Sequence, residues 1–443
     1  MIKQTFFALA LGVVAVAAAA PAGAQTASPA PGGTTAPAVS PSPAKPLVTP
    51  TGAPSATPAA SPSEPPKFIQ LSGFGDGGFT AVNGTDAARF TTGVPSRIFD
   101  AATGPFFDAN GGRLLARPND FNNTLDLQNA NVQLTLTGPV VSAKFEGSLG
   151  TDADVIASNG QSRGGVNLTY AYLQFARGPV TVLAGKFATL AGAEVIESPN
   201  DSNYSRSYLF GEAVPFTHTG VRVTYAATPK VSVIAGVNNG WDDWKFDGKK
   251  KTLEGGLAIN PSPGYSLTLQ TYNGNDFALG GQGGANLTPY PPLYTNRMLY
   301  DGVLTVHPTG ALTLIANYDN GTQLSGSQNV GAQAPLAFST QHWNGIAGYA
   351  NYQFTPKYGI SLRKETFHDV TGFRTGIAQR LQSNTATLGY TPNNNYIFRA
   401  EYRLDTTDAN SFTYRGYVPT IGAPFDGRPH QSSIGVETIV KFP

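Results

Sequence analysis

The sequence predicts an all-β fold, a transmembrane antiparallel up-and-down β-barrel of about sixteen strands, and three observations predict it. Apolar and polar residues alternate with a period of two from Phe68 to Phe442. Many of the alternating runs reach about ten residues, the length that a tilted strand needs to cross a bilayer. The connections between them are alternately short and long, as in barrels with short periplasmic turns and long extracellular loops.

The alternation is clear in the segment 396–405. Its apolar positions are Tyr396, Phe398, Ala400, Tyr402 and Leu404, and its polar positions are Arg399, Glu401, Arg403 and Asp405. Successive side chains of a strand point to opposite faces, so the pattern predicts one apolar and one polar face. A soluble sandwich would alternate in the same way, and it remains the alternative for this observation.

Turn residues set the boundaries of the expected strands. The short connectors contain Pro or Gly, which favour turns, and they are 137–140, 177–179, 228–230, 260–264, 307–310, 355–357 and 391–395. The long polar stretches between them are 75–124, 150–165, 188–216, 240–252, 275–294, 321–341, 369–380 and 406–430. The expected strands are 68–74, 125–137, 140–149, 166–176, 180–187, 217–227, 231–239, 253–260, 264–274, 295–307, 311–320, 342–354, 358–368, 381–391, 395–405 and 431–442.

Aromatic residues favour the membrane barrel over the soluble sandwich. Those beside the short turns are Tyr225, Tyr265, Tyr352, Phe354, Tyr358, Tyr390, Tyr396 and Phe398. Parity places them on the apolar face, where an aromatic girdle meets the periplasmic interface. Candidates for a second girdle at the opposite interface are Phe187, Tyr272, Tyr318 and Trp343.

The first 67 residues differ in kind from the rest. Residues 1–24 carry Lys3, an apolar stretch and Ala22-Gly23-Ala24, which together predict a Sec-type signal peptide. Twelve prolines fall within residues 26–66, so neither a helix nor a sheet ladder can form there. We expect residues 25–67 to be a disordered periplasmic linker, either a cell-wall tether or a plain tail, and residues 68–443 to be the barrel in a Gram-negative-type outer membrane.

Composition excludes several other classes. Only 13% of residues are charged, about half the usual share, and the net charge is +1, so a nucleic-acid partner is not expected. The mean hydropathy of −0.15 disfavours a bundle of membrane helices. Without Cys there is no disulfide framework and no thiolate metal site.

Three local patterns were weighed for other chemistry. The run Gly73–Gly78 satisfies G-x-G-x-x-G, but no helix start follows, so we interpret it as a strand-to-loop transition. Asp242, Asp243 and Asp247 lack the pattern of a calcium loop. No His has a nucleophile and an acid at a spacing that indicates catalysis. We therefore expect no catalytic site, no metal and no cofactor.

Four segments carry the most specific likeness to a known family, and they are 185–200, 203–211, 215–222 and Asn239-Gly-Trp-Asp242. In these segments the chain resembles the OmpL-like family of β-barrel porins, and the resemblance extends over roughly 68–442. The resemblance implies an outer-membrane pore and allows a homotrimer, although no interface is evident in the sequence. It also implies assembly by the barrel-assembly machinery. The chain departs from the usual terminal aromatic residue by ending Phe442-Pro443.

A barrel of this size is wide enough for an aqueous channel, so the expected function is a porin for passive diffusion of small hydrophilic solutes through the outer-membrane lipid. The stretch 188–216 mixes charges with apolar residues, so we expect it to fold inward as a constriction, and a lid packed on the rim of the barrel is the alternative. The candidate pore-lining and constriction residues are Lys144, Lys186, Glu194, Glu197, Arg206, Arg222, Arg363, Glu365, Arg399, Glu401 and Arg403.

Two questions stay open at this point. Arg363, Arg399 and Arg403 could form a basic ladder facing an acidic loop, or they could pair with Glu365, Glu401 and Asp405. Parity places equal numbers of acidic and basic side chains on the lumen faces, which predicts weak ion selectivity. The alternative functions are a substrate-specific channel, for carbohydrate for example, and a plugged barrel that serves as a structural envelope anchor.

Overall fold

The computed structural model describes residues 68–82, 97–98, 107–108, 124–158, 161, 165–245, 251–277, 294–327, 337–375, 378–409 and 428–442. All of them belong to one compact unit, residues 42–443. The signal peptide expected at 1–24 and the linker expected at 25–67 lie outside the described residues.

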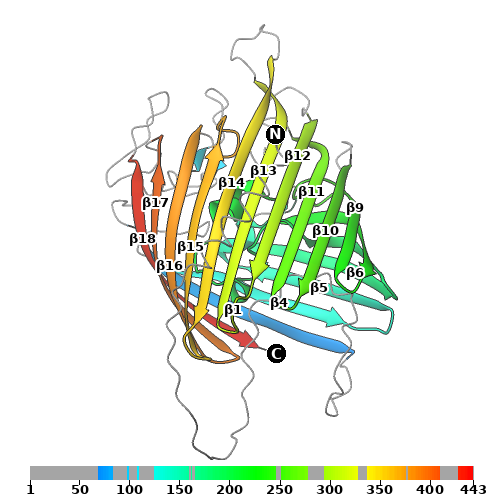
Figure 1. Ribbon diagram of the computed structural model, residues 1–443, viewed down its shortest axis with the longest axis horizontal. Helices are drawn as coiled ribbons and strands as arrows, with labels where there is room; N and C mark the ends of the chain where they lie inside the picture. Colours follow the sequence, from blue (N-terminus) through cyan, green and yellow to red (C-terminus); the bar gives the residue numbers. More distant parts are fainter. Residues whose placement is uncertain are drawn as a thin grey trace, which may run out of the picture. The chain divides into compact units, whose positions relative to one another are not determined.

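Sixteen strands close into one antiparallel barrel in which neighbours in the chain are neighbours in the sheet (Figure 1). They are β1 (Ile69–Val82), β4 (Thr124–Leu136), β5 (Val141–Leu149), β6 (Val166–Arg177), β7 (Val180–Ala188), β8 (Thr217–Thr228), β9 (Val231–Asn238), β10 (Thr252–Ser262), β11 (Tyr265–Phe277), β12 (Tyr294–Val306), β13 (Leu312–Ser327), β14 (Ala337–Gln353), β15 (Tyr358–Asp369), β16 (Gln379–Asn393), β17 (Tyr396–Thr407) and β18 (His430–Phe442). The first strand, β1, pairs with β4 on one side and with the last strand, β18, on the other. Closure leaves no strand edge, so the backbone groups of the barrel are satisfied even in lipid. The predicted fold class is confirmed.

The described connections contain little other regular structure. The short strands β2 (Arg97–Ile98) and β3 (Phe107–Asp108) form a separate two-stranded sheet. The described helical segments are α2 (Thr151–Val155), the 3₁₀-helix η1 (Ser198–Asn200) and the π-helix η2 (Leu209–Ala213). Within the described ranges, no helix has the length and apolar character needed to cross a bilayer.

The strands follow the predicted positions, with two main differences at their ends. β13 and β14 continue beyond the predicted spans 311–320 and 342–354 and form a longer hairpin, yellow in Figure 1. β1 runs through the whole motif Gly73–Gly78, so the strand-to-loop transition expected there is wrong.

The glycine at the start of that motif has a packing reason. Gly73 pairs with Phe442 across the junction of the first and last strands. A Cβ on Gly73 would lie 2.5 Å from the Phe442 ring and 2.1 Å from the carbonyl oxygen of Asn131. Glycine is therefore required for the close approach of these strands, and the G-x-G pattern reflects sheet packing.

The outer face of the barrel is apolar, as the alternation predicts. Large exposed side chains occur on many strands and include Leu125, Leu173, Val221, Leu362, Ile434 and Val436. A surface of this extent is stable only against lipid or another apolar partner.

The girdle predicted beside the short turns is confirmed. Tyr352, Phe354, Tyr358, Tyr396 and Phe398 are all exposed on the outer face, as are Tyr225 and Tyr265. Tyr390 is half-buried because its ring stacks on Tyr358, with centroids 4.6 Å apart, and on Phe398, with centroids 6.0 Å apart. These stacks lie where interfacial aromatic residues are favoured.

The candidates for the second girdle are mostly wrong. Phe187, Tyr272 and Trp343 are only 1%, 2% and 0% exposed and point into the barrel, and only Tyr318 keeps a half-exposed outward position. The physical reason is that a loop packs against the inner face at this end, so apolar residues are stable on both faces of the wall.

Replacing an apolar side chain on the lipid face tests this assignment. Val436→Arg, in the middle of β18, should lower the free energy of unfolding by about 2–4 kcal/mol because an ion is then exposed to the bilayer core. Urea titration of the protein folded in lipid vesicles measures the difference. Val436→Leu is the control, and equal midpoints for the two variants would contradict a lipid-facing position.

Candidate functional site

The connection between β7 and β8, residues 189–216, runs inside the barrel. Its first residues bond successive strands of the wall: the backbone N–H of Leu190 donates to Tyr272 on β11 (3.3 Å), that of Gly192 to Asp301 on β12 (3.1 Å), and that of Ala193 to Asn317 on β13 (3.1 Å). These partners all lie on the inner face, since their side chains are buried. The inward folding expected for this stretch is therefore observed.

Wall carboxylates bind the backbone of the middle of the loop. Glu401 on β17 accepts hydrogen bonds from the N–H groups of Tyr204 (2.8 Å) and Ser205 (3.0 Å). Glu365 on β15 accepts one from the N–H of Tyr208 (2.6 Å). A buried irregular segment has no ladder to satisfy its N–H groups, and these ionisable acceptors supply the missing partners.

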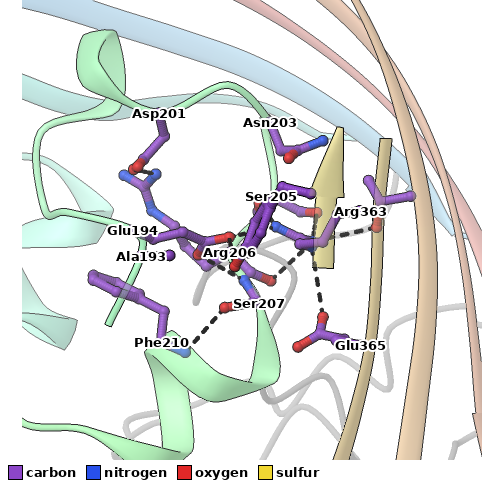
Figure 2. A network of polar contacts seen from close by, with 12 residues as sticks. Ala193, Glu194, Asp201, Asn203, Ser205, Arg206, Ser207, Phe210, Arg363 and Glu365 are labelled. Atoms are coloured by element: carbon purple, nitrogen blue, oxygen red, sulfur yellow. Dashed lines mark hydrogen bonds and ion pairs between the residues drawn. The ribbon is translucent and has the colours of Figure 1, made fainter. Parts of the chain in front are cut away.

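Three wall arginines bind the carbonyl groups of the same loop. Arg363 donates to the carbonyl oxygen of Ser205 (2.7 Å), and Arg403 to that of Arg206 (2.6 Å). Arg399 reaches the carbonyl of Ser198 at 3.1 Å. Figure 2 shows Arg363 meeting the loop from its strand, with Glu194 and Ser205 on the loop side.

Each of these arginines also has an acidic partner. Arg363 pairs with Glu194 of the loop at 2.8 Å and with Glu365 of its own strand at 3.6 Å. Arg399 pairs with Glu437 at 2.5 Å, and Arg403 with Asp405 at 2.7 Å. Within the loop, Arg206 pairs with Asp201 and lies over the Phe210 ring.

The prediction that Arg363, Arg399 and Arg403 form a basic ladder opposite an acidic loop is wrong. The loop lies directly on Arg363, Arg399 and Arg403, so these charges do not face an acidic loop across open water. The pairing alternative describes them better, with one difference. Glu401 pairs with none of the three and instead binds backbone N–H groups and the hydroxyl of Thr387.

Two glycines of the wall leave room for a side chain of the loop. The Tyr204 ring occupies space that a Cβ on Gly435 would enter, at 2.4 Å, and its hydroxyl lies 2.8 Å from where a Cβ of Gly78 would be. That hydroxyl is hydrogen-bonded to Thr80 on β1 (2.8 Å) and to Gln128 on β4 (2.6 Å). Glycines at these positions therefore create a recess in the wall for one loop side chain.

An apolar cluster fills the space between the loop and β11–β16. Leu209 and Val214 of the loop pack with Tyr272, Trp343 and Phe367 of the wall. The indole N–H of Trp343 donates to the carbonyl of Ala213 at 3.1 Å. This cluster explains why aromatic residues at this end of the strands point inward.

The remaining predicted residues lie on the wall nearest to the start of the loop. Lys144 pairs with Glu146 (2.9 Å), and Arg222 pairs with Glu254 (2.8 Å) and lies over the Phe187 ring. Lys186 donates to Gln161 and to the carbonyl of Leu168. The loop residue Glu197 is close enough to act electrostatically on Lys144. The predicted set is thus divided between β15 and β17, whose side chains bind the loop backbone, and β5, β7 and β8, whose side chains pair mainly with one another or with neighbouring strands.

Sequence reasoning missed the residues that hold the end of the loop. The Oδ1 atom of Asp242 accepts the N–H groups of Phe216 and Thr217, each at 2.8 Å, and burial raises the pKa of Asp242 to about 6. Asp242 has φ 55°, a conformation that Asp tolerates better than most residues. The acidic residues at 242–247 are the signal that the sequence contains for this role, although their spacing suggests only a comparison with calcium loops. In the described residues no group of His, Asp and Glu is placed to hold a metal ion, and Asp247 lies outside them.

Arg374, between β15 and β16, holds the same end from the other side. Its Nε donates to the carbonyl of Glu212, and its guanidinium lies 5.3 Å from the Trp241 ring centroid and 5.3 Å from that of Trp343. Burial, together with the nearby charge of Arg297, lowers the pKa of Arg374 to about 10. No periodicity marks a loop residue of this kind.

A closed barrel with an apolar exterior, an aromatic girdle and a loop folded into a polar interior is the architecture of an outer-membrane channel. Residues 101–442 match the family described as "Putative beta-barrel porin-2, OmpL-like". The chain belongs to this family, and the protein is an outer-membrane porin, a channel rather than an enzyme.

Solved structures agree in fold. The outer membrane channel DcaP of Acinetobacter baumannii is 15% identical with a TM-score of 0.52, covering 84% of this chain and 97% of that one. The anion-selective porin of Comamonas acidovorans is 12% identical with a TM-score of 0.51, covering 84% and 99%. OmpT of Vibrio cholerae in its trimer form is 11% identical with a TM-score of 0.50, covering 84% and 99%. No curated protein matches the chain by sequence.

Limited proteolysis can measure how firmly the wall holds the loop. Arg206 is the only Lys or Arg between Lys186 and Arg222, so trypsin has one site in this loop. Arg363→Ala removes the partner of Glu194 and of two loop carbonyls, and breaking such a buried pair costs about 3–5 kcal/mol. Cleavage at Arg206 should then accelerate on the order of tenfold or more, because cleavage follows the population of the released loop.

The control for this experiment is the neighbouring residue. Lys364 is exposed on the outer face of the same strand, so Lys364→Ala should leave the cleavage rate unchanged. Heat-dependent migration in a denaturing gel verifies that each variant has formed its barrel. A rate for Arg363→Ala equal to that of Lys364→Ala would show that the wall does not hold the loop.

The pKa of Asp242 predicts how pH affects this end of the loop. A pKa of about 6, raised from 3.8, means that the folded protein binds a proton here more tightly than the unfolded chain. The resulting stabilisation is fully present below the unfolded pKa and is lost as pH rises through about 6. The stability of the wild type relative to Asp242→Asn should therefore fall by about 2–3 kcal/mol between low and neutral pH. Denaturant unfolding of both proteins at several pH values measures this difference.

Proposed function

We propose that small hydrophilic solutes cross the outer membrane by passive diffusion through this barrel, and that the loop 189–216 is its constriction. Sixteen strands enclose more space than their own side chains fill. The loop occupies part of that space and is bound to β11–β17 through side chains of the wall. The docking of this loop on side chains of the barrel wall is the observation that carries the proposal.

The route for solutes then lies beside β5 and β6, where inner-face side chains keep some exposure. Lys144 on β5 keeps 23% of its side chain exposed, whereas the wall arginine Arg363 keeps none. Tyr172 and Gln174, on the inner face of β6, are likewise half-exposed. These residues and Glu197 of the loop are the candidates for contact with a passing solute.

The many contacts of the loop favour a fixed constriction over a mobile gate. Releasing the loop would leave Glu401, Glu365 and Arg363 without the backbone groups they bind. Leaving buried charged groups without partners is costly, so the docked form dominates. The channel is therefore proposed to have one main conductance level.

Deleting the middle of the loop tests the proposal. Removing residues 192–210 should raise the single-channel conductance in a planar bilayer because the constriction is gone. Lys364→Ala, which changes an exposed residue on the outer face of β15, is the control and should leave the conductance of the wild type. Unchanged conductance for the deletion, or an equal rise for both variants, would contradict the proposed role of the loop.

Two alternatives give different results in the same assays. A plugged barrel that serves as an envelope anchor would conduct in neither form. A substrate-specific channel would show saturation when liposome swelling is measured with sugars of graded size, whereas a diffusion pore would show a dependence on size alone.

The proposal also covers the export of the protein and its assembly in the membrane. Residues 1–24 are proposed to direct export and 25–67 to form a periplasmic linker, and the barrel-assembly machinery is proposed to recognise the strand that ends at Phe442. A homotrimer is supported by the trimer form of the Vibrio cholerae OmpT, a barrel of similar fold.

A further inference from the structure

Acidic side chains are collected inside the barrel. The chain as a whole is almost neutral, with a net charge of +1. Yet among the Asp and Glu residues whose side chains are described, seventeen are buried and only Asp126 and Asp408 are not. The buried ones are Asp76, Glu146, Asp152, Glu194, Glu197, Asp201, Glu212, Asp242, Asp243, Glu254, Asp301, Asp319, Glu365, Asp369, Glu401, Asp405 and Glu437.

Basic side chains are distributed in the opposite way. Of the Lys and Arg residues in the same described ranges, seven are buried, and they are Lys186, Arg206, Arg222, Arg297, Arg363, Arg399 and Arg403. Eleven others are partly or fully exposed, and they are Lys144, Arg177, Lys230, Lys245, Lys251, Lys357, Lys364, Arg374, Arg380, Arg428 and Lys441. Even when Lys144 and Arg374, which are partly exposed but face the interior, are added to the buried basic residues, the described interior carries more carboxyl groups than basic groups.

The sequence predicted equal numbers of acidic and basic side chains facing the lumen, and the structure corrects this prediction. Parity counts only the residues of strands, and there it finds equal numbers of both signs. The additional acids come mainly from loops that fold inward, such as Glu194, Glu197 and Asp201 between β7 and β8 and Asp242 and Asp243 after β9. Parity has no information on the position of a loop.

Neutral groups stabilise many of these carboxyl groups without cancelling their charge. Glu401 binds two backbone N–H groups, and Asp369 binds the N–H groups of Arg374 and Thr375 and the Thr375 hydroxyl. A carboxyl group held in this way has no cation beside it, whereas the charge of one paired with Arg contributes little at a distance.

The wall of such a barrel has a low dielectric constant, so the field of the excess charge is focused along the interior. Rings of Asp and Glu select cations in other channels by the same physics. We infer that this porin prefers cations, both inorganic ions and small organic amines, over anions. The inference rests on the proposed function, because it names the solute class of the same constriction.

Glu197 is the residue at which this preference can be tested locally. It belongs to the loop, is 9% exposed, and acts on Lys144, the partly exposed cation on β5. A cation that passes between the loop and β5 therefore meets a carboxylate on the loop side. Asp408 provides the matched control, because it has the same charge but lies exposed at the end of β17.

The zero-current potential of the full-length protein in a planar bilayer, measured across a gradient of potassium chloride, tests the inference. A permeability ratio of potassium to chloride on the order of ten is expected, since a potential of about one kT at each ion changes cation and anion concentrations in opposite directions. Glu197→Gln should lower this ratio roughly twofold, and Asp408→Asn should leave it unchanged.

The possible results distinguish a failure of the proposed function from a failure of the cation preference. No conductance would reject the proposed function itself. A conducting channel with a ratio near one, or with a preference for chloride, would keep the proposed function and overturn the cation preference. The cation preference is also overturned if Glu197→Gln shifts the zero-current potential no more than Asp408→Asn does.

Discussion

The structure depends on one set of interactions, the bonds between ionisable side chains of the wall and the backbone of the loop 189–216. An irregular segment inside a barrel carries N–H and C=O groups that no strand can satisfy. Here Glu401 and Glu365 accept from the N–H groups, and Arg363 and Arg403 donate to the carbonyls. The loop shields these side chains from water, and its backbone groups replace the hydrogen bonds that water would make with them.

Wall and loop are therefore stable only together. Burying a guanidinium or a carboxylate costs several kcal/mol unless its geometry is well satisfied. Arg363 meets that condition with bonds to Glu194, Ser205 and Thr385. The apolar cluster around Leu209 and Trp343 adds burial on the same side of the loop, so the loop is fixed by both polar and apolar contacts.

The sequence was sufficient to predict the strands, their two faces and the short turns, but not the contacts between residues far apart in the chain. Alternation in 396–405 correctly placed Arg399 and Arg403 on the face opposite Tyr402, because the two-residue period is a local property. Short turns with Pro or Gly marked the strand pairs for the same reason. The inward position of Tyr272 and Trp343 and the partners of Glu401 depend on contacts between residues far apart in the chain. The role of Arg374, in a loop without periodicity, leaves no local pattern at all.

The recess for Tyr204 has a consequence for assembly. Its parts are Gly78 and Thr80 on β1, Gln128 on β4 and Gly435 on β18, which are strands from the two ends of the chain. This recess does not exist until the first and last strands have paired. The loop that narrows the channel can thus reach its final position only in a cylinder that is already complete, and an open or misregistered sheet has no place for it.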